Sequence, residues 1–430
     1  MIEPKVLKGF KDSLPQEEFY RKYLISKIED NLKLYGYLPI DTPTLEYKEI
    51  LLGKGGGETD KQVFIFKDKG DREVGLRYDL TVPLARFIAM HENEIVFPFK
   101  RYHIAKAWRG EKPQRGRFRE FYQADFDIIG IDSIESDIEI ISLIYNLLKN
   151  LGIDNITIKI NDRSLMHQIF KKIGISNYEK EILLILDKYY KIPEKEFIEN
   201  LKNIIGDKSE EILRITKFEN RENLFDFLKD RYDIYSTRLE KVIDFFKQIN
   251  LQEFVTIDFT ITRGLDYYTG IVFETFIKDY VELGSVCSGG RYDNLTSIFS
   301  KNKYSGIGSS IGLDRLISYL FEKNLIPKVS FCNLLIANLN PSDLGLYYKI
   351  LNKMHSSQIS CEIYPEATKL KKQFKYSEDK NIPFILFLGE EEKEKSILKL
   401  KNIDTGKEIV FSTIEKLIDY LKNPQNSTSL

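Results

Sequence analysis

Residues 117–129 read RFREFYQADFDII, and their side chains alternate between two unlike sets. One set is mainly apolar and consists of Phe118, Glu120, Tyr122, Ala124, Phe126 and Ile128. The other set is mainly polar and consists of Arg117, Arg119, Phe121, Gln123, Asp125 and Asp127. A period of two residues is typical of a β-strand with different faces. The stretch therefore predicts a strand that joins a core through one face and offers binding groups on the other.

A second extended segment, which begins near Phe97, precedes this strand across a polar loop at residues 110–116. Between Lys100 and Arg119 the chain has eight lysines and arginines and a single acidic residue, Glu111. A solvated basic hairpin would explain this charge. However, the face that carries the arginines also carries an aromatic ring, an amide and two carboxylates. That mixture favours a site for a ligand with phosphates, an aromatic base and an amine.

The composition excludes several classes of protein. The chain has 430 residues, which at roughly 100–200 residues per domain suggests two to four domains. Its net charge of −1 argues against an overall basic protein, although it says nothing about local basic patches. Cys287, Cys332 and Cys361 are too few and too scattered for a disulfide framework or a paired-cysteine zinc site, which favours a reduced, cytosolic compartment. No signal peptide and no apolar run of about 18 residues is present, so we expect a soluble protein.

Hydrophobic periodicity predicts the order of the elements. Helices are expected at 15–35, from about 79, at 134–151 and at about 311–322, and strands at 37–43, 62–66, 73–77, 156–160, 254–262 and 271–277. Residues 162–252 are highly charged and mostly helical in pattern, as in a helical insertion. Short apolar strands are expected at 333–339, 361–364 and 383–388, separated by helical segments. This last pattern indicates a small α/β domain.

Three further segments combine glycines with an arginine. Residues 262–270 read TRGLDYYTG and predict a tight turn with two tyrosines, which could also serve only to anchor a hairpin. Residues 288–293, SGGRYD, predict a Gly-Gly turn that places an arginine. Residues 306–316 predict a loop and a helix start that carries Arg315, although Arg315 could also simply pair with Asp314 or a neighbouring acid. Neither the common phosphate loop nor the dinucleotide fingerprint occurs, so arginines are the remaining means of holding nucleotide phosphates.

These segments together resemble the histidyl-tRNA synthetases, a family of class II aminoacyl-tRNA synthetases. The resemblance rests on LRYDLT at 76–81, WRGE at 108–111, REFYQ at 119–123, RGLDYY at 263–268, SGGRYD at 288–293 and GLDR at 312–315. The segments occur in the family's order and with its spacing. KKQFKY at 371–376 and LGE at 388–390 are similar to the family's C-terminal anticodon-binding domain.

The resemblance implies an α+β fold, in which an antiparallel sheet flanked by helices carries the active site. It implies a class II catalytic domain at residues 1–160 and 253–325, interrupted by a helical insertion domain at 161–252. An anticodon-binding α/β domain would occupy residues 329–430. It also implies a homodimer, formed through the helix and strand at 15–43.

The resemblance further implies ligation of L-histidine to tRNA through histidyl-adenylate, with ATP and Mg²⁺, in the cytoplasm and away from membranes. ATP would be bound by Arg109, Glu111, Arg117, Phe121 and Arg315. Histidine would be bound by Asp79, Thr81, Arg109, Gln123, Asp127, Arg263, Tyr267 and Tyr268. Catalysis would depend on Arg263, Arg109 and Arg315, with Arg263 in a place that other class II enzymes give to a metal ion, so no resident metal site is expected. The tRNA would be contacted at its acceptor end and its anticodon.

Two alternatives belong to other functional classes. A non-catalytic paralogue, such as a regulatory subunit or amino-acid sensor, would typically lose catalytic arginines or the C-terminal domain, and this chain keeps both. A plain RNA-binding protein would leave the acidic and amide groups of the polar face unexplained. The chain has Asp79-Leu80-Thr81 where some family members carry Glu-Gly-Thr, and Asp127 where some carry Glu. Both changes keep a carboxylate but alter the dimensions expected of the pocket.

Overall fold

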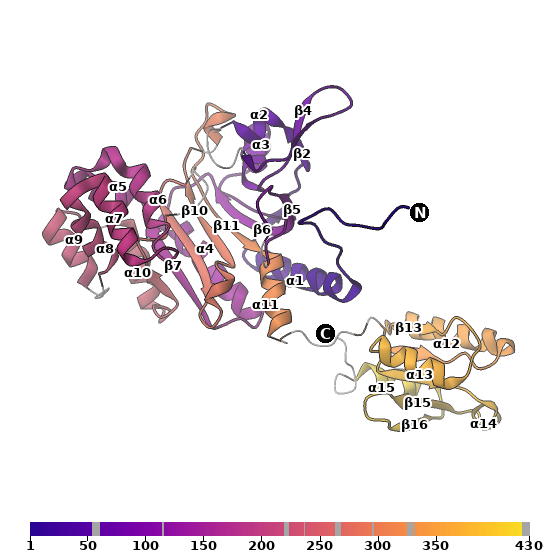
Figure 1. The fold of residues 1–430 in the computed structure, drawn as a ribbon. Helices are drawn as coiled ribbons and strands as arrows, with labels where there is room; N and C mark the ends of the chain where they lie inside the picture. The colour runs from indigo at the N-terminus through magenta and orange to yellow at the C-terminus, as the bar shows by residue number, and fades with distance from the viewer. Residues whose placement is uncertain are drawn as a thin grey trace. The chain divides into compact units, whose positions relative to one another are not determined.

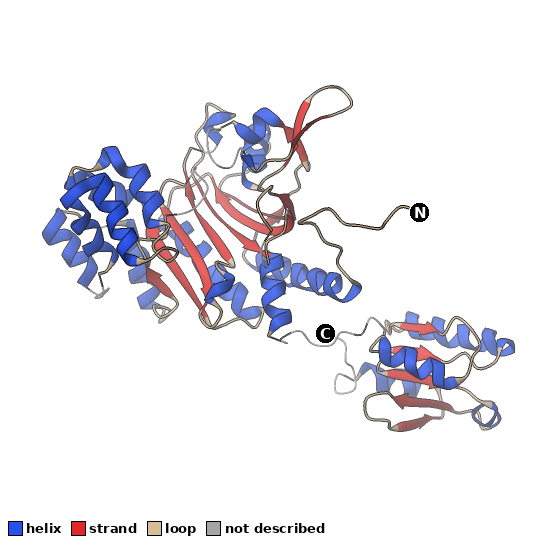
Figure 2. Cartoon of the chain, in the orientation of Figure 1, coloured by secondary structure: helices blue, strands red, loops and turns tan. Residues whose placement is uncertain are grey.

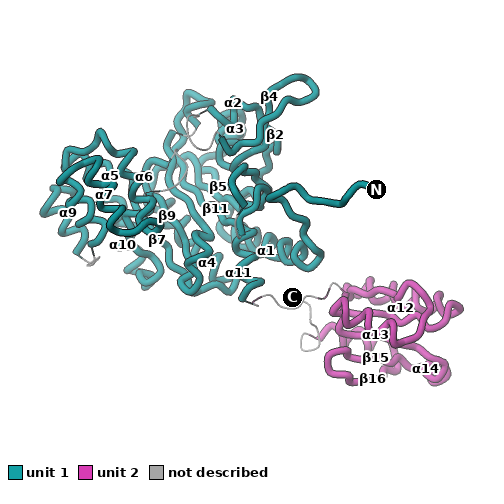
Figure 3. The backbone as a smooth tube through the Cα atoms, viewed as in Figure 1, with its two compact units in different colours: residues 1–323 teal, residues 324–430 magenta. Residues whose placement is uncertain are grey.

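The computed structural model describes residues 1–53, 61–113, 116–218, 223–235, 237–262, 268–294, 296–323, 325, 330 and 332–423. These residues belong to two compact units, Met1–Lys323 and Asn324–Leu430, which Figure 3 shows in different colours. Each unit is built around its own main β-sheet, and each is described by itself below.

An eight-stranded sheet forms the centre of the first unit (Figures 1 and 2). Its strands follow the order β1 (Leu38–Pro39), β5 (Phe99–Trp108), β6 (Glu120–Ile129), β11 (Gly306–Gly312), β10 (Cys287–Tyr292), β9 (Ile271–Ile277), β7 (Ile156–Asp162) and β8 (Val255–Ile257). Neighbouring strands are antiparallel except for the outermost pairs, β1 with β5 and β7 with β8. Together with the flanking helices and the separate C-terminal α/β unit, this sheet confirms the predicted fold class.

The strand predicted from alternation is β6, and it lies in the interior of this sheet. Ala124, Phe126 and Ile128 are buried on its apolar face, as expected. The polar face is buried as well from Gln123 onward, because Gln123 and Asp127 are each less than one-tenth exposed. Burial of unpaired polar groups is costly, so this face must be matched by partners from neighbouring strands or by a ligand.

Outside residues 162–252, the longer helices that the structure describes in the first unit are α1 (Pro15–Leu34), α3 (Thr81–His91), α4 (Ile134–Asn150) and α11 (Leu313–Glu322). Ser133 begins α4 by accepting a hydrogen bond from the backbone nitrogen of Ser136, a common way to satisfy a helix N-terminus. The predicted helices at these places are confirmed. The helix expected from about residue 311 starts at Leu313, because β11 continues through Gly312. A three-stranded sheet of β2 (Leu45–Tyr47), β4 (Glu73–Leu76) and β3 (Ile65–Lys67) and the short α2 (Lys48–Leu52) complete this part.

Two expectations about the glycine-rich part of the chain are wrong. The segments predicted as a Gly-Gly turn and a loop are the central strands β10 and β11. Glycine is required there because a Cβ atom on Gly289 would lie 2.1 Å from the backbone oxygen of Gly308 in the next strand. The strand predicted at 254–262 ends at Ile257, because Oδ1 of Asp258 accepts hydrogen bonds from the backbone and hydroxyl of Thr260 and turns the chain.

Residues 162–252 are largely helical, as predicted. They contain α5 (Arg163–Ile173), α6 (Glu179–Leu186), α7 (Glu194–Ile205), α8 (Ser209–Thr216), α9 (Leu224–Tyr232) and α10 (Arg238–Gln248), with 3₁₀ turns at Ser176–Tyr178 and Gly206–Lys208. In Figure 1 these helices gather on the side of the sheet where β7 lies, next to the edge strand β8. Arg238 ties α10 to α4 through Asp137. Other 3₁₀ turns lie at Val281–Leu283, Thr296–Ile298 and, in the second unit, Pro341–Asp343.

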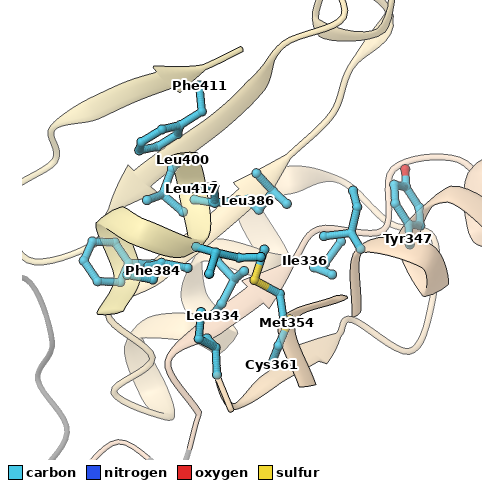
Figure 4. Packing of buried hydrophobic residues seen from close by; sticks show 14 of the residues in the cluster. Leu334, Ile336, Tyr347, Met354, Cys361, Phe384, Leu386, Leu400, Phe411 and Leu417 are labelled. Carbon is cyan, nitrogen blue, oxygen red and sulfur yellow. The ribbon is translucent and has the colours of Figure 1, made fainter. Parts of the chain in front are cut away.

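The second unit has a five-stranded sheet in the order β13 (Cys361–Ile363), β12 (Leu334–Ile336), β14 (Phe384–Phe387), β15 (Leu398–Asn402) and β16 (Glu408–Phe411). Its helices are α12 (Leu344–Ser356), α13 (Leu370–Asp379), α14 (Glu390–Glu394) and α15 (Ile414–Lys422). Figure 4 shows the core in which Met354, Leu386 and Leu417 meet. The three predicted strands are present. The strands β15 and β16 were not predicted, because each is short and charged residues interrupt its apolar pattern.

Candidate active site

A cavity of about 140 Å³ opens at the Phe121 end of β6. All five residues predicted to bind ATP line it, namely Arg109, Glu111, Arg117, Phe121 and Arg315. They come from the end of β5 and the following loop, from β6 and from α11. Gln123, predicted to bind histidine, lines the same cavity.

Arginines surround this cavity from several sides. Arg315 donates a hydrogen bond from Nη1 to the backbone oxygen of Ser285 at 2.5 Å. Burial, and secondarily the charge of Arg117, lowers the pKa of Arg315 to about 10. The guanidinium of Arg109 lies 5.0 Å from the ring centre of Phe121, and its Nε donates to the backbone oxygen of Tyr78 at 3.2 Å. Like charges held together in this way are suited to bind a polyanion.

The side chain of Gln123 is held through its amide nitrogen, which leaves its amide oxygen available to accept a hydrogen bond. Its Nε2 donates a hydrogen bond to Ser310 Oγ in β11 at 2.7 Å. The Oε1 atom is buried and has no hydrogen-bond partner in the described part of the chain. Ser310 also hydrogen-bonds Asp125, so the hydroxyl that orients the amide is itself held in place. An oriented, unsatisfied acceptor is suited to an ammonium group.

Asp79 and Thr81 meet at the N-terminus of α3. Oδ1 of Asp79 accepts hydrogen bonds from the backbone nitrogens of Thr81, at 3.1 Å, and Val82, at 2.9 Å. Burial raises the pKa of Asp79, while these two bonds and the charge of Arg109 act in the opposite direction. The carboxyl group is therefore fixed beside the arginine that lines the cavity.

Asp127 lies farther along the same face of β6 and contacts two other strands. Its Oδ1 accepts a hydrogen bond from the hydroxyl of Tyr292 at 2.6 Å, and its Oδ2 lies 2.5 Å from Nη2 of Arg101. A Cβ atom on Gly308 would lie 1.9 Å from Oδ1. Tyr268 packs with Tyr292 in a small cluster close to this carboxylate. The structure therefore gathers the predicted histidine-binding residues that it describes along one strand face and its surroundings.

Two predicted residues, Arg263 and Tyr267, lie outside the described residues. Arg291, which the sequence placed in a turn, is instead buried in β10 and ion-paired with Asp137 of α4 at 2.6 Å. Sequence reasoning missed Arg101 and Tyr292 as neighbours of Asp127. For Arg101 a signal was present, because pairing the two strands of the hairpin places it directly opposite Asp127.

Within the described ranges, no group of three or more His, Cys, Asp or Glu side chains is arranged to hold a metal ion. Among the helices that the structure describes, none is both long and apolar enough to cross a lipid bilayer.

Comparison with known families places this geometry in context. The model of the family described as histidyl-tRNA synthetase matches residues 9–316. The model of the anticodon binding domain matches residues 334–424. The chain is 46% identical over 403 residues to a histidine–tRNA ligase of Treponema denticola, with 91% of this chain and 90% of that protein covered. It is 40% identical to a histidine–tRNA ligase of Clostridium tetani, with 98% and 99% covered.

Solved structures show the same fold. The crystal structure of histidyl-tRNA synthetase from Nostoc sp. PCC 7120 superposes with a TM-score of 0.87 at 29% identity and covers 97% of this chain and 99% of that one. A structure from Bacillus halodurans, described as an ATP phosphoribosyltransferase regulatory subunit/histidyl-tRNA synthetase, superposes with a TM-score of 0.74. Its identity is only 21%, over 89% of this chain and 97% of that one, so it shows the fold alone.

Proposed function

Because the chain belongs to the histidyl-tRNA synthetase family, we propose that it joins L-histidine to its tRNA in two steps. In the first step, a carboxylate oxygen of histidine attacks the α-phosphorus of ATP, pyrophosphate leaves and histidyl-adenylate forms. In the second step, a hydroxyl of the terminal ribose of tRNA attacks the acyl carbon, and AMP leaves.

The observation that carries this proposal is the order of groups along one face of β6. Phe121 lies at the cavity with the arginines, Gln123 follows with its available amide oxygen, and Asp127 comes last with its buried carboxyl group. These groups match a nucleotide phosphate, an ammonium group and an imidazole in the order in which histidyl-adenylate presents them. A single extended ligand could therefore contact the whole face.

Five side chains would bind ATP. Arg109 would contact the α-phosphate, and Arg315 would contact the γ-phosphate side and one face of adenine. Phe121 would stack on the other face of adenine, with Glu111 near the base and Arg117 near the phosphates. Because Arg109 and Arg315 are already held by backbone carbonyl groups, little reorganisation is needed when negative charge develops at phosphorus.

The remaining side chains would bind histidine. Asp79, Thr81 and Gln123 would hold the ammonium group, and Asp127 and Tyr268 would bracket the two imidazole nitrogens. An apolar substrate would leave these buried polar groups unpaired, and such sites can discriminate by roughly 10⁴–10⁵-fold. Arg263 would contact the substrate carboxylate and the α-phosphate, and Tyr267 would support the pocket.

Mg²⁺ would enter with ATP, bound to the phosphate oxygens, and would neutralise part of their charge. We further propose a homodimer, which is supported by two exposed apolar side chains, Leu34 at the end of α1 (82% exposed) and Leu38 in β1 (59% exposed). Residues 1–160 and 253–325 would form the catalytic domain, residues 161–252 the insertion, and residues 329–430 the anticodon-binding domain. The tRNA would thus be contacted at its acceptor end and its anticodon. As a translation enzyme, the protein would work in the cytoplasm.

The test is histidine-dependent exchange of radiolabelled pyrophosphate into ATP by the purified protein. We expect exchange with L-histidine and none above background with phenylalanine or glutamine. A folded protein that shows no exchange with histidine would exclude adenylate formation and favour a non-catalytic relative of the family.

A further inference from the structure

Arg101, on β5, is the largest fully buried side chain in the part of the chain that the structure describes. It lies directly opposite Asp127 in the register of β5 and β6. Cross-strand pairs at such positions share one face of the sheet. Its Nη2 lies 2.5 Å from Oδ2 of Asp127, so a full positive charge stands behind the carboxyl group that would bind the imidazole.

The contact between these two charges does not have hydrogen-bond geometry. Nε, Nη1 and Nη2 of Arg101 and Oδ2 of Asp127 are buried and lack a hydrogen-bond partner among the described residues. Arg101 therefore acts on Asp127 mainly through its charge, and Oδ2 keeps the capacity to accept a hydrogen bond. The other oxygen, Oδ1, is held by Tyr292, which limits rotation of the carboxyl group.

Several charged or titratable groups face Asp127 from the surrounding elements. They are Arg101 on β5, Asp125 on β6, Tyr292 on β10, Asp79 before α3, and Tyr37 before β1. The facing residue of β11 is Gly308, which has no side chain. Arg101 is thus a buried positive charge close to three buried carboxyl groups, those of Asp79, Asp125 and Asp127. Burial raises the pKa of Asp127, and the charge of Arg101 is the largest influence in the opposite direction.

We propose that Arg101 is a positioning residue for histidine recognition, which keeps the Asp127 side chain ionised and oriented as an acceptor for an imidazole N–H. This inference rests on the proposed function, because it assumes that Asp127 contacts the imidazole. Arg101 itself touches no substrate. An ionised acceptor makes a stronger hydrogen bond than a neutral one, whereas a protonated Asp127 would present a donor at one oxygen.

The proposal predicts a specific effect of Arg101→Met. The KM for histidine in pyrophosphate exchange should rise about tenfold or more, as expected when a hydrogen bond to a charged group is lost. The ratio of this KM to that of the wild type should increase as the pH falls from 8 to 6, because Asp127 would become protonated. Protonation of free histidine affects the KM of both proteins equally at each pH, so it cancels in this ratio. The KM of Arg101→Met for ATP should change less than about twofold. Arg101→Lys, which keeps the positive charge, should show the same pH dependence of the histidine KM as the wild type.

A double-mutant cycle with Asp127→Asn separates positioning from general loss of structure. If Arg101 acts through Asp127, Arg101→Met should add less than about a twofold change in the histidine KM to the Asp127→Asn background. The double variant removes both charges of the buried pair, which proteins often tolerate better than removal of one. It therefore remains informative if Arg101→Met alone does not fold.

Arg86→Met is the matched control, since it removes another arginine that is ion-paired in a partly buried position, with Glu46 at 2.7 Å. It should leave the histidine KM and its pH dependence unchanged. A pH-independent KM ratio for Arg101→Met, or a double variant about tenfold worse than Asp127→Asn, would overturn the role of Arg101 while the proposed function stands. Lack of exchange by the wild type would instead overturn the proposed function.

Discussion

Arg163 donates a hydrogen bond from Nη1 to the backbone oxygen of Tyr268 at 3.0 Å. Its Nη2 donates to the backbone oxygen of Thr262 at 2.8 Å. The hydroxyl of Thr262 donates in turn to the backbone oxygen of Leu183 in α6. Arg163 is the first residue of α5, so the helical insertion holds the chain on both sides of the segment that contains Arg263.

Arg163→Lys should lower the kcat of pyrophosphate exchange about 5- to 30-fold, because an ammonium group is a point donor and cannot reproduce the fork of a guanidinium. The melting temperature should change little, since a positive charge is retained. Arg231→Lys is the matched control within the insertion, where Arg231 pairs with Glu211 near the surface. Equal activity of the two variants in a steady-state exchange assay would contradict this role of Arg163.

Asp125→Asn should flatten the pH dependence of stability. Burial raises the pKa of Asp125 from 3.8 to about 7, so the folded protein holds the proton more tightly than the unfolded chain. The contribution of Asp125 to stability therefore falls as the pH rises from about 4 to 7. The variant should match the wild type near pH 4 and melt at a higher temperature near pH 8. As a control, the exposed Asp244→Asn variant should show the same pH dependence of the melting temperature as the wild type. If the melting temperature of Asp125→Asn also follows the wild type at every pH, the prediction is refuted.

Gly308→Ala should damage the proposed histidine pocket around Asp127. The new methyl group would lie 1.9 Å from Oδ1 of Asp127, so the carboxyl group or the strand must move, at a cost of about 1–3 kcal/mol. We expect the KM for histidine to rise far more than the KM for ATP, together with a lower melting temperature. Gly345→Ala in α12 is the control, because its methyl group would meet no atom within 4 Å. A normal histidine KM in a folded Gly308→Ala protein would show that the pocket lies elsewhere.

A chain that ends at Lys323 should retain exchange but lose efficient charging of tRNA. Each unit has its own sheet, and the second unit has its own apolar core, so removal of residues 324–430 leaves the cavity residues in place. The measurement compares pyrophosphate exchange with aminoacylation of histidine tRNA for the full and shortened chains. Unimpaired aminoacylation by the shortened chain would exclude a role of the second unit in binding tRNA.

The strand β6 and the long helices were predictable because their patterns arise within one element. Alternation along β6 follows from the pleat of a strand, and the spacing of Leu24, Ile28 and Leu32 in α1 follows from the helical turn. All three leucine and isoleucine side chains are buried, as this spacing requires. The arginines of the cavity were also predictable, because Arg109 and Arg117 belong to one dense cluster of charge in the sequence and Arg315 belongs to a short glycine-containing motif.

The glycine-rich strands and the corrected end of β8 were not predictable from local rules. Glycine is usually depleted in strands, and only the approach of Gly289 to the oxygen of Gly308 shows why it is needed here. The turn at Asp258 depends on its side chain, which accepts a hydrogen bond from the backbone nitrogen of Thr260. This local bond competes with the strand that the surrounding apolar residues suggest.

Most of the elements, the class of fold and the chemical character of the site could be predicted from the sequence, because these depend on residue types and on periods of two or about 3.6 residues. By contrast, the burial of Arg101 against Asp127, in place of a solvated basic hairpin, depends on tertiary packing. Tertiary packing also brings Gly308, Tyr292 and Ser310 around β6, a strand more than 160 residues earlier in the chain. Register between distant strands and the desolvation of charges are set by packing, and no local pattern contains them.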